Sequence, residues 1–326
     1  MRAIIITQPG GPDVLQLAER PKPKPQKNEV LIAVKAFGLN RAELYFRSGA
    51  WGDVAEISGI ECAGLVEADP DGFFKVGQKV IGIMGGMGRT RPGSYAEYVS
   101  VPRDHVVALN SKLSWEDFAA LPESYATAWT CLIGNLKITK SQTLVVRGGT
   151  SALGQAAINI AKDIGVNVIA TTRNKTHIET LRAIGASHVI VGEGDMTTRL
   201  REYAKHGADA VLDLIGSTTL LDSLAMTKRG GYVCIAGFLG GGAPLAEFNP
   251  VFQMPGGVNL NSFASAFAYG TPDFPLSEVP FQQFVDKAEA GIYRARPSHI
   301  LKFDQIAKAH QLMETNEAVG KIVILV

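Results

Sequence analysis

The chain has 326 residues, more than one ordinary hydrophobic core accommodates, so we expect two domains. Hydrophobic residues make up 46% and charged residues 19% of the sequence, which excludes a disordered chain. The net charge of +1 comes without a basic tract, so a nucleic-acid partner is not expected.

The N-terminal segment, MRAIIITQPGG, contains an apolar run shorter than the ~7–15 residues of a signal peptide core. No stretch reaches the ~18 apolar residues of a membrane span. The three cysteines, Cys62, Cys131 and Cys234, have the spacing of neither a metal site nor a disulfide framework. We therefore expect a cytoplasmic protein without a membrane anchor.

Short β-type runs, divided by Gly, Pro and Asp, dominate roughly the first third of the chain. They lie at 14–19, 29–39, 62–68, 78–84 and 95–101. Residues 20–29, between the first two runs, are rich in proline and lysine, which is typical of an extended, solvated connection. This part of the chain is predicted to form a β-rich, partly barrel-like domain.

A helical pattern begins near Trp115 and covers residues 114–134, with Ser114 as the expected N-cap and Asp117 in the first turn. Strands and helices then alternate. The predicted strands are 143–148, 166–172, 188–192, 209–216 and 231–238. The predicted helices are 151–165, 175–185, 196–205 and 220–228. Alternation with nearly continuous Val, Ile and Leu strands predicts a doubly wound parallel sheet, an α/β unit over residues 122–257.

The remainder of the chain is less regular. Residues 240–258 form a Gly- and Pro-rich loop, 275–291 are predicted to be helical, and 320–326 form a final strand. The segment 300–315 lies between them.

The turn after the predicted strand 143–148 resembles a dinucleotide-binding turn, because it joins a strand to a helix through glycines. Gly149 permits the tight turn, and Gly154 permits close packing of the helix on the sheet. The amides of Ser151, Ala152 and Leu153 are expected at the helix N-terminus, where a pyrophosphate binds. Ser151 replaces the usual central glycine; a negative φ would still let the backbone approach, and its hydroxyl would be able to donate to a phosphate. The alternative is an ordinary strand–helix turn with no ligand.

The next strand indicates which dinucleotide is bound. An acidic residue at its end selects NAD, whereas basic residues accept the 2′-phosphate of NADP. The segment from Ala170 to His177 has no carboxylate but contains Thr172, Arg173 and Lys175. Arg173 suits a bidentate phosphate contact and Lys175 a point-charge contact. We therefore predict NADPH as the cofactor; the alternative is a solvated helix start with incidental basic residues.

The sequence resembles the medium-chain dehydrogenase/reductase superfamily, in its zinc-free quinone oxidoreductase branch. The resemblance covers nearly the whole chain and rests on segments such as AFGLNRAELYFRSGAW, GIECAGLVEA, GSYAEYVSVP, GGTSALG and GKIVILV. It implies a GroES-like domain, residues 1–121 completed by 258–326, and a Rossmann domain, residues 122–257. It also implies a homodimer formed through the Rossmann domains.

The resemblance further allows the metal positions of zinc-dependent relatives to be compared. Where those enzymes carry two Cys ligands and one His ligand, this sequence has Asn40, Glu123 and Ile60. Isoleucine does not bind a metal, so we expect a zinc-free enzyme. Glu123 is unusual at its position and is interpreted either as an acid with a raised pKa or as a salt-bridge partner of Arg41 or Arg47.

The resemblance places Asn40 and Tyr45 beside the nicotinamide, Asn40 polarising a carbonyl and Tyr45 donating a proton. The alternatives are a bracing role for Asn40 and a packing role for Tyr45. It places further residues at the cofactor: Thr127, Phe238, Ser262, Phe263 and Lys321, the last near the pyrophosphate. The alternatives are helix packing for Thr127 and a surface position for Lys321. His177 follows the basic cluster and receives no assigned role.

Without zinc, hydride transfer requires an acceptor that is already electrophilic, such as a quinone or an α,β-unsaturated carbonyl. The prediction is an NADPH-dependent reductase of such small molecules. Two alternatives stay open: an enoyl-thioester reductase, and a non-catalytic NADPH-binding protein of the crystallin type.

Overall fold

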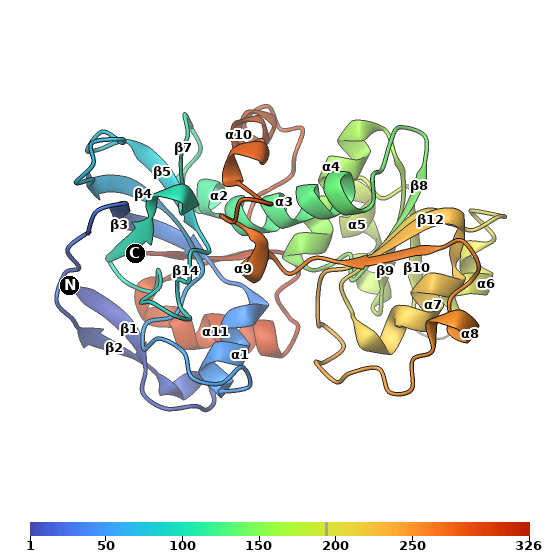
Figure 1. Cartoon of the computed structure of the whole chain (residues 1–326), viewed down its shortest axis with the longest axis horizontal. Helices are drawn as coiled ribbons and strands as arrows, with labels where there is room; N and C mark the ends of the chain where they lie inside the picture. Colours follow the sequence, from blue (N-terminus) through green and yellow to red (C-terminus); the bar gives the residue numbers. More distant parts are fainter. Residues whose placement is uncertain (193–194) are drawn as a thin grey trace. The chain divides into compact units, whose positions relative to one another are not determined.

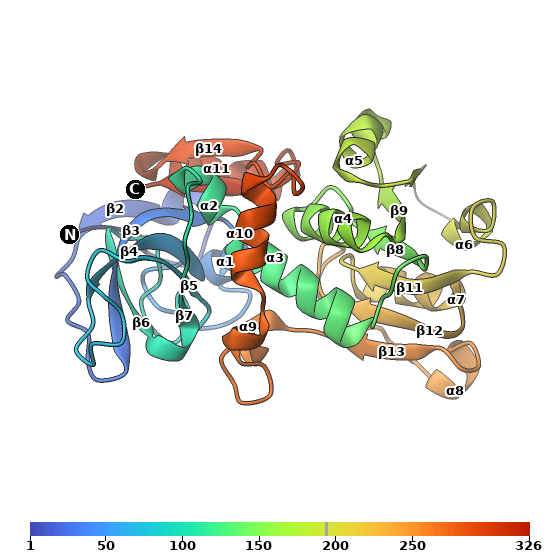
Figure 2. The same ribbon diagram turned by 90° about the horizontal axis from the view of Figure 1, so that it is seen from above.

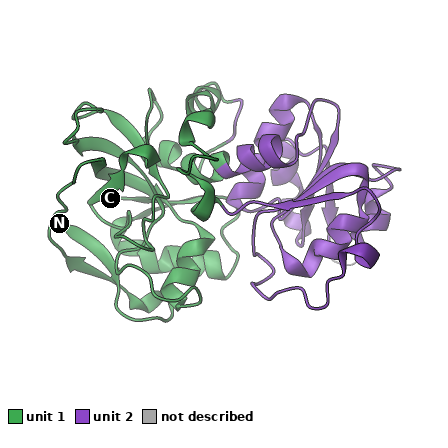
Figure 3. Ribbon diagram, viewed as in Figure 1, with its two compact units in different colours: residues 1–126, 265–291, 295–326 green, residues 127–264, 292–294 purple. Residues whose placement is uncertain are grey.

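The computed structural model of the chain describes residues 1–192 and 195–326. It divides into two compact units (Figure 3). Unit 1 comprises residues 1–126, 265–291 and 295–326, and unit 2 comprises residues 127–264 and 292–294. The expected division was at 121/122 and 257/258, a few residues earlier at each boundary.

Unit 2 is built on a six-stranded sheet in the order β10-β9-β8-β11-β12-β13. All five pairings are parallel. The strands are β8 (Thr143–Arg147), β9 (Asn167–Thr172), β10 (His188–Val191), β11 (Ala208–Asp213), β12 (Thr227–Ile235) and β13 (Asn259–Ser262). The strand order reverses between β8 and β11, and ligands of such sheets bind at the carboxyl ends of the strands beside this reversal.

Helices cover both faces of this sheet, α4 and α5 on one face and α6 and α7 on the other (Figure 1). The helical elements are η3 (Thr130–Asn135, a π-helical turn), α4 (Ala152–Ile164), η4 (Lys175–His177), α5 (Ile178–Ile184), α6 (Met196–Leu200), η5 (Ser217–Thr219), α7 (Leu220–Ala225) and α8 (Pro250–Gln253). The α3 helix (Pro122–Trp129) crosses the division between the units in sequence. Four neighbouring strands each carry an apolar side chain that is at most 1% exposed: Val145, Ile169, Val211 and Val233. This burial explains the apolar runs in their sequences.

Unit 1 contains a seven-stranded sheet in the order β14-β15-β3-β4-β5-β7, with β6 also paired to β3, and a separate pair β1-β2. The strands are β1 (Arg2–Ile6), β2 (Leu15–Glu19), β3 (Glu29–Gly38), β4 (Glu61–Ala68), β5 (Lys79–Ile83), β6 (Tyr98–Pro102), β7 (Val106–Ala108), β14 (His299–Lys302) and β15 (Ile322–Leu325). The C-terminal β15 lies between β14 and β3, so the last strand of the chain completes a sheet whose earliest strand in sequence is β3.

The helices of unit 1 are short. They are η1 (Pro12–Val14), α1 (Arg41–Ser48), η2 (Arg103–His105), α2 (Trp115–Ala119), α9 (Ser265–Ala268), η6 (Leu276–Glu278), α10 (Phe281–Glu289), η7 (Phe303–Gln305) and α11 (Ile306–Glu314). Ser114 caps α2 as predicted, its hydroxyl accepting the Asp117 amide. Figure 2 shows α11 beside β14. Among the described residues, no helix is both long and apolar enough to span a bilayer.

Candidate functional site

The turn between β8 and α4 is stabilised by hydrogen bonds within the turn itself. Gly148 has a φ of 82°, a left-handed conformation that favours glycine. Ser151 has a φ of −70°, so this position does not require a glycine. Its Oγ donates to the Gly148 carbonyl at 2.8 Å and accepts the Gly154 amide at 3.1 Å. The expectation that this hydroxyl donates to a phosphate is therefore corrected: Ser151 caps the helix, and its single proton is already used.

Two backbone amides remain for a ligand at the start of α4. The first intrahelical backbone hydrogen bond runs from the Gln155 amide to the Ser151 carbonyl at 2.9 Å. The amides of Ala152 and Leu153 precede the first residue able to bond within the helix, and they carry the positive end of its dipole. The serine cap thus leaves the same anion-binding helix end that the glycine-rich pattern predicts.

Gly154 is in close contact with the turn. A Cβ added there would lie 2.4 Å from the Gly148 carbonyl oxygen and 2.9 Å from the Gly149 Cα. We expect Gly154→Ala to lower the free energy of unfolding by roughly 1–3 kcal/mol and to raise the KM for NADPH, because the helix must move away from the turn. Thermal unfolding and initial rates measure both. Gly242→Ala is the control, since nothing lies within 4 Å of its added Cβ; equal behaviour of the two variants would contradict the close-contact argument.

Basic side chains gather at the carboxyl end of β9. Thr172 is buried and its hydroxyl contacts the Asn174 backbone, which fixes the chain where it leaves the sheet. Arg173 and Lys175 follow it and are exposed. Arg199 of α6, which the sequence analysis did not single out, donates to the Val191 carbonyl at the end of the neighbouring β10. The edge that meets the adenosine ribose in dinucleotide-binding folds therefore carries Arg173 and Lys175 after β9 and, at the end of β10, the guanidinium of Arg199 from α6.

Four of the other residues assigned to the cofactor lie in three places within unit 2. Phe238 follows β12 and is 47% exposed. Ser262 ends β13, and the Phe263 amide donates to the Ile235 carbonyl at 2.9 Å. Thr127 is buried on α3. The segments of Phe238, Ser262 and Phe263 thus leave the carboxyl ends of β12 and β13, on the same edge of the sheet as the Gly148 turn.

In unit 1, Asn40 is held by a buried ion pair. Lys321 is 5% exposed and its Nζ lies 2.5 Å from Oε1 of Glu61, which is fully buried. The same ammonium donates to Asn40 Oδ1 at 2.7 Å, and Asn40 Nδ2 donates back to Glu61 Oε1 at 2.9 Å. The other Glu61 oxygen accepts the Glu123 amide at 2.8 Å. Two of the three N–H groups of Lys321 are therefore used inside unit 1, which leaves one for a ligand.

A second carboxylate holds the start of α1. Glu43 is fully buried and accepts the amides of Asn40 at 2.7 Å and Ile60 at 3.0 Å. It also accepts the Tyr95 hydroxyl at 3.0 Å, and that hydroxyl lies 2.9 Å from His310 Nε2. Burial lowers the pKa of His310 to about 3, so its imidazole is neutral. Glu43 thereby fixes the Asn40 backbone, while Glu61 and Lys321 fix its side chain.

Burial is also the main reason that the pKa of Glu43 is raised to about 7, against the opposing effect of the two amide hydrogen bonds. Because the folded pKa lies above the unfolded value of 4.5, the folded state keeps a proton that the unfolded state releases, and the free energy of unfolding falls as pH rises through this window. We expect this group to contribute a fall of roughly 3 kcal/mol between about pH 5 and 7.5. Urea unfolding of wild type and Glu43→Gln measures it. The account fails if this variant keeps the wild-type pH dependence; exposed Glu202→Gln is the control.

Tyr45 contributes to an aromatic wall at the end of α1. Its ring stacks on Trp51, with centroids 4.9 Å apart and planes at 27°, and Trp51 also meets Phe46 edge-on at 5.7 Å. Phe46 and Ile60 line a small apolar pocket with Met84 and Met87. An apolar, partly aromatic surface therefore adjoins the segment that carries Asn40, as a flat conjugated molecule requires.

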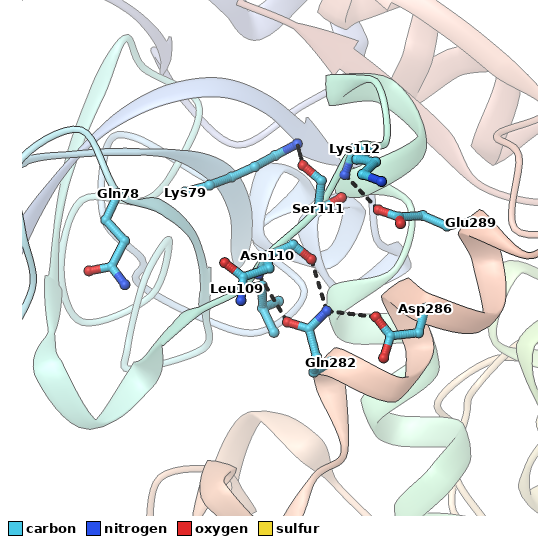
Figure 4. Close-up of a pocket in the computed structure, with 9 residues that line it drawn as sticks. All are labelled: Gln78, Lys79, Leu109, Asn110, Ser111, Lys112, Gln282, Asp286 and Glu289. Carbon is cyan, nitrogen blue, oxygen red and sulfur yellow. Dashed lines mark hydrogen bonds between the residues drawn. The ribbon is translucent and has the colours of Figure 1, made fainter.

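A second, open pocket of unit 1 has a different character. Figure 4 shows that its polar side chains engage one another: Gln282 pairs with the backbone of Asn110 and donates to Asp286 at 2.8 Å, and Glu289 accepts the Lys112 amide. Its lining includes neither Asn40 nor Tyr45. We do not assign the chemistry to it.

Comparisons with known proteins agree with this architecture. A family model described as a zinc-binding dehydrogenase matches residues 152–275, and one described as an alcohol dehydrogenase GroES-like domain matches residues 26–111. The human protein named quinone oxidoreductase is 27% identical over 338 residues, covering 100% of this chain and 98% of that protein. The chain belongs to the medium-chain dehydrogenase/reductase superfamily, in its quinone oxidoreductase branch.

Members of this superfamily differ in their cofactors and substrates. The structure of mycobacterial Rv1454c complexed with NADPH has a TM-score of 0.87 and 27% identity, with both chains covered fully. A protein of Sulfurisphaera tokodaii named NAD-dependent alcohol dehydrogenase is also 27% identical, with both chains covered fully. Membership therefore makes the chain an oxidoreductase, and the choice of cofactor and acceptor rests on its own residues.

The residues at the superfamily's metal positions do not fit zinc. Ile60 has a hydrocarbon side chain, and the Asn40 amide oxygen already accepts a hydrogen bond from the Lys321 ammonium. Glu123, whose Oε1 accepts the Ser265 hydroxyl at 3.4 Å, would be a single carboxylate ligand. The Lys321 ammonium thus supplies a positive charge directly beside Asn40. Of the two arginines considered as partners of Glu123, Arg47 pairs with Glu314 instead.

Glu61 and Glu43 were not predicted from the sequence as parts of this site. Glu61 directly follows Ile60, so the signal was present in the segment GIE, and Glu43 stands three residues after Asn40. Nothing in the sequence connected either of them with Lys321 or His310. His177 ends η4, and the structure gives it no contact that assigns a role.

Proposed function

We propose that this protein transfers a hydride from NADPH to a quinone or an α,β-unsaturated carbonyl without a metal. The observation that carries the proposal is the buried Lys321–Glu61–Asn40 cluster, which replaces a metal donor set with a closed ion pair. An acceptor here receives no Lewis-acid activation, so it must be electrophilic by its own conjugation.

The cofactor part of the proposal rests on unit 2. The Ala152 and Leu153 amides would bind the pyrophosphate beside Gly149 and Gly154, and Arg173 and Lys175 would bind the 2′-phosphate. Thr127, Thr172, Phe238, Ser262 and Phe263 would line the remainder, and the resemblance also assigns Lys321 to the pyrophosphate. NADPH supplies two electrons and one hydrogen as a hydride, and the reduced acceptor takes up one proton.

In unit 1, Tyr45 is proposed to donate that proton to the oxyanion that develops on the acceptor, while the wall of Tyr45 and Trp51 orients the flat substrate. Asn40 holds this segment in place. Because Nδ2 already donates both to Glu61 Oε1 and, at 3.4 Å, to the Gly38 carbonyl, a bracing role is supported better than direct polarisation of a carbonyl.

Oxidation of NADPH, followed at 340 nm, tests the proposal against 9,10-phenanthrenequinone, 1,4-benzoquinone, an alkenal and crotonyl-CoA, with and without EDTA. We expect turnover of a quinone or the alkenal that EDTA does not change. Preferred turnover of crotonyl-CoA would favour an enoyl-thioester reductase. Binding of NADPH without turnover of any acceptor would favour a non-catalytic, crystallin-like protein.

We further propose a cytoplasmic homodimer formed through unit 2. The edge strand β13 is open at the end of the sheet, and the neighbouring Val251 and Phe252 on α8 are 81% and 85% exposed. Three buried free cysteines are in keeping with a reducing compartment. Sedimentation of wild type and of Phe252→Asp tests the assembly, since a charge at this position should yield monomers.

A further inference from the structure

Arg89 differs from the other arginines beside it in unit 1. Several arginines of this unit pair with carboxylates: Arg20, Arg47, Arg91 and Arg103. Arg89 is half-buried and no carboxylate of the described chain lies within salt-bridge distance of it. Its guanidinium instead lies over the ring of Phe267, 4.4 Å from the centroid, and Phe267 itself is 69% exposed.

Stacking on a ring leaves this guanidinium available to a ligand. The face of the planar cation contacts Phe267, whereas its N–H groups point outward in the plane of the cation. A carboxylate or sulfonate accepts two such N–H groups at once, which is the geometry that arginine provides and lysine does not. The ring thus holds the cation in one orientation without neutralising its charge.

The position of Arg89 relates it to the acceptor. Arg89 lines the same small pocket as Phe46 and Ile60. Phe46 directly follows Tyr45 in α1 and contacts Trp51, and Ile60 directly precedes Glu61. With a volume of only about 10 Å³ this pocket does not hold a ring system, so an acceptor ring would lie outside it, against Tyr45 and Trp51, and Phe46 connects that wall to Arg89 at the edge of the pocket.

We propose that Arg89 selects acceptors that carry an anionic group, a carboxylate or a sulfonate, on their conjugated ring system. This inference rests on the proposed function and specifies the substrate class of the same site. An apolar ring would lie against the aromatic wall while its anionic substituent pairs with the guanidinium. A neutral acceptor of equal size would still contact the aromatic wall but would not pair with the guanidinium.

Two acceptors of nearly equal size test this: 9,10-phenanthrenequinone-2-carboxylate and its methyl ester. The ratio of their kcat/KM values is measured for wild type, Arg89→Met and Arg89→Lys, so that differences in intrinsic reactivity cancel. We expect Arg89→Met to lower the carboxylate-to-ester ratio about tenfold or more, the value of one charge-assisted contact. Arg89→Lys should recover part of it. Arg103→Met is the control, because that guanidinium also lies over an exposed ring, that of Phe73, but pairs with Asp71.

Three results would overturn the inference: an unchanged ratio in Arg89→Met, an equal loss for both acceptors, or a rise in the KM for NADPH with the ratio unchanged, which would assign Arg89 to a cofactor phosphate. A binding titration distinguishes failure of the inference about Arg89 from failure of the proposed function. The carboxylate is titrated without cofactor, and quenching of tryptophan fluorescence gives its Kd. Weaker binding to Arg89→Met than to wild type, with no turnover by either, would keep the anion site and reject the reductase.

Discussion

Replacing Arg173 and Lys175 together by alanine is expected to raise the KM for NADPH about 100-fold and to change the KM for NADH less than about threefold. Both side chains are exposed, so we expect each phosphate contact to contribute about 1.4 kcal/mol to NADPH binding, which is a factor of ten in the KM. NADH lacks the 2′-phosphate and loses nothing when these cations are removed.

Initial rates with a fixed quinone and either nucleotide measure the effect. Arg182→Ala is the control, since Arg182 is an exposed arginine of α5 that pairs with Glu179. Equal losses for NADPH and NADH would contradict the assignment of these residues to the 2′-phosphate. Arg199→Ala, tested in the same way, shows how much the second strand end contributes.

Replacing Lys321 by methionine is expected to lower the free energy of unfolding by about 3–5 kcal/mol. The substitution leaves the fully buried Glu61 carboxylate without its cation, and an uncompensated buried charge costs this much. The double variant Lys321→Met/Glu61→Gln removes both charges together and should regain most of the loss.

Urea unfolding of the two single variants and the double variant gives the coupling energy. Lys22→Met is the control, because Lys22 pairs with Glu67 at the surface of the same unit and such pairs contribute about 0–1 kcal/mol. Similar losses for Lys22→Met and Lys321→Met would contradict the account of Lys321 as the buried counter-charge of Glu61.

The sequence predicted those parts of the fold that follow from local pattern. The alternating apolar strands and helices of unit 2 lie near where their periodicity placed them, because the central strands are buried on both faces and are therefore mostly apolar, with exceptions such as Arg147 and Asp213 at their carboxyl ends. The predicted helix over 114–134 is divided at Pro122, since proline starts a helix well and interrupts one badly. Strand β13 was not predicted: its sequence NLNS has no apolar run, and it forms because β12 supplies hydrogen-bond partners.

The assignment of residues to the candidate site stays a prediction, and the contacts that the structure shows among them could not be predicted from the sequence. Ser151 was recognised as compatible with the turn, but its role as helix cap depends on the approach of Gly148 and Gly154. Lys321 and Glu61 stand 260 positions apart in sequence, and only the pairing of β15 with β3 brings them together. No local pattern marks Arg89 as unpaired, because that property depends on where the carboxylates of other segments lie.

In the proposed site the chain's own charges act in two different ways. Lys321 is neutralised by Glu61 and holds Asn40, whereas Arg173, Lys175 and Arg89 are exposed or unpaired. We expect Lys321 to contribute to the stability of the fold, and Arg173, Lys175 and Arg89 to determine which ligands bind.

The most direct test of metal-free, NADPH-dependent reduction is the kcat/KM for 9,10-phenanthrenequinone after the protein has been dialysed against EDTA and its zinc content measured. The account predicts the same value, within about twofold, before and after dialysis, with NADPH preferred to NADH. Loss of activity that returns when Zn²⁺ is added, or a preference for NADH, would contradict it.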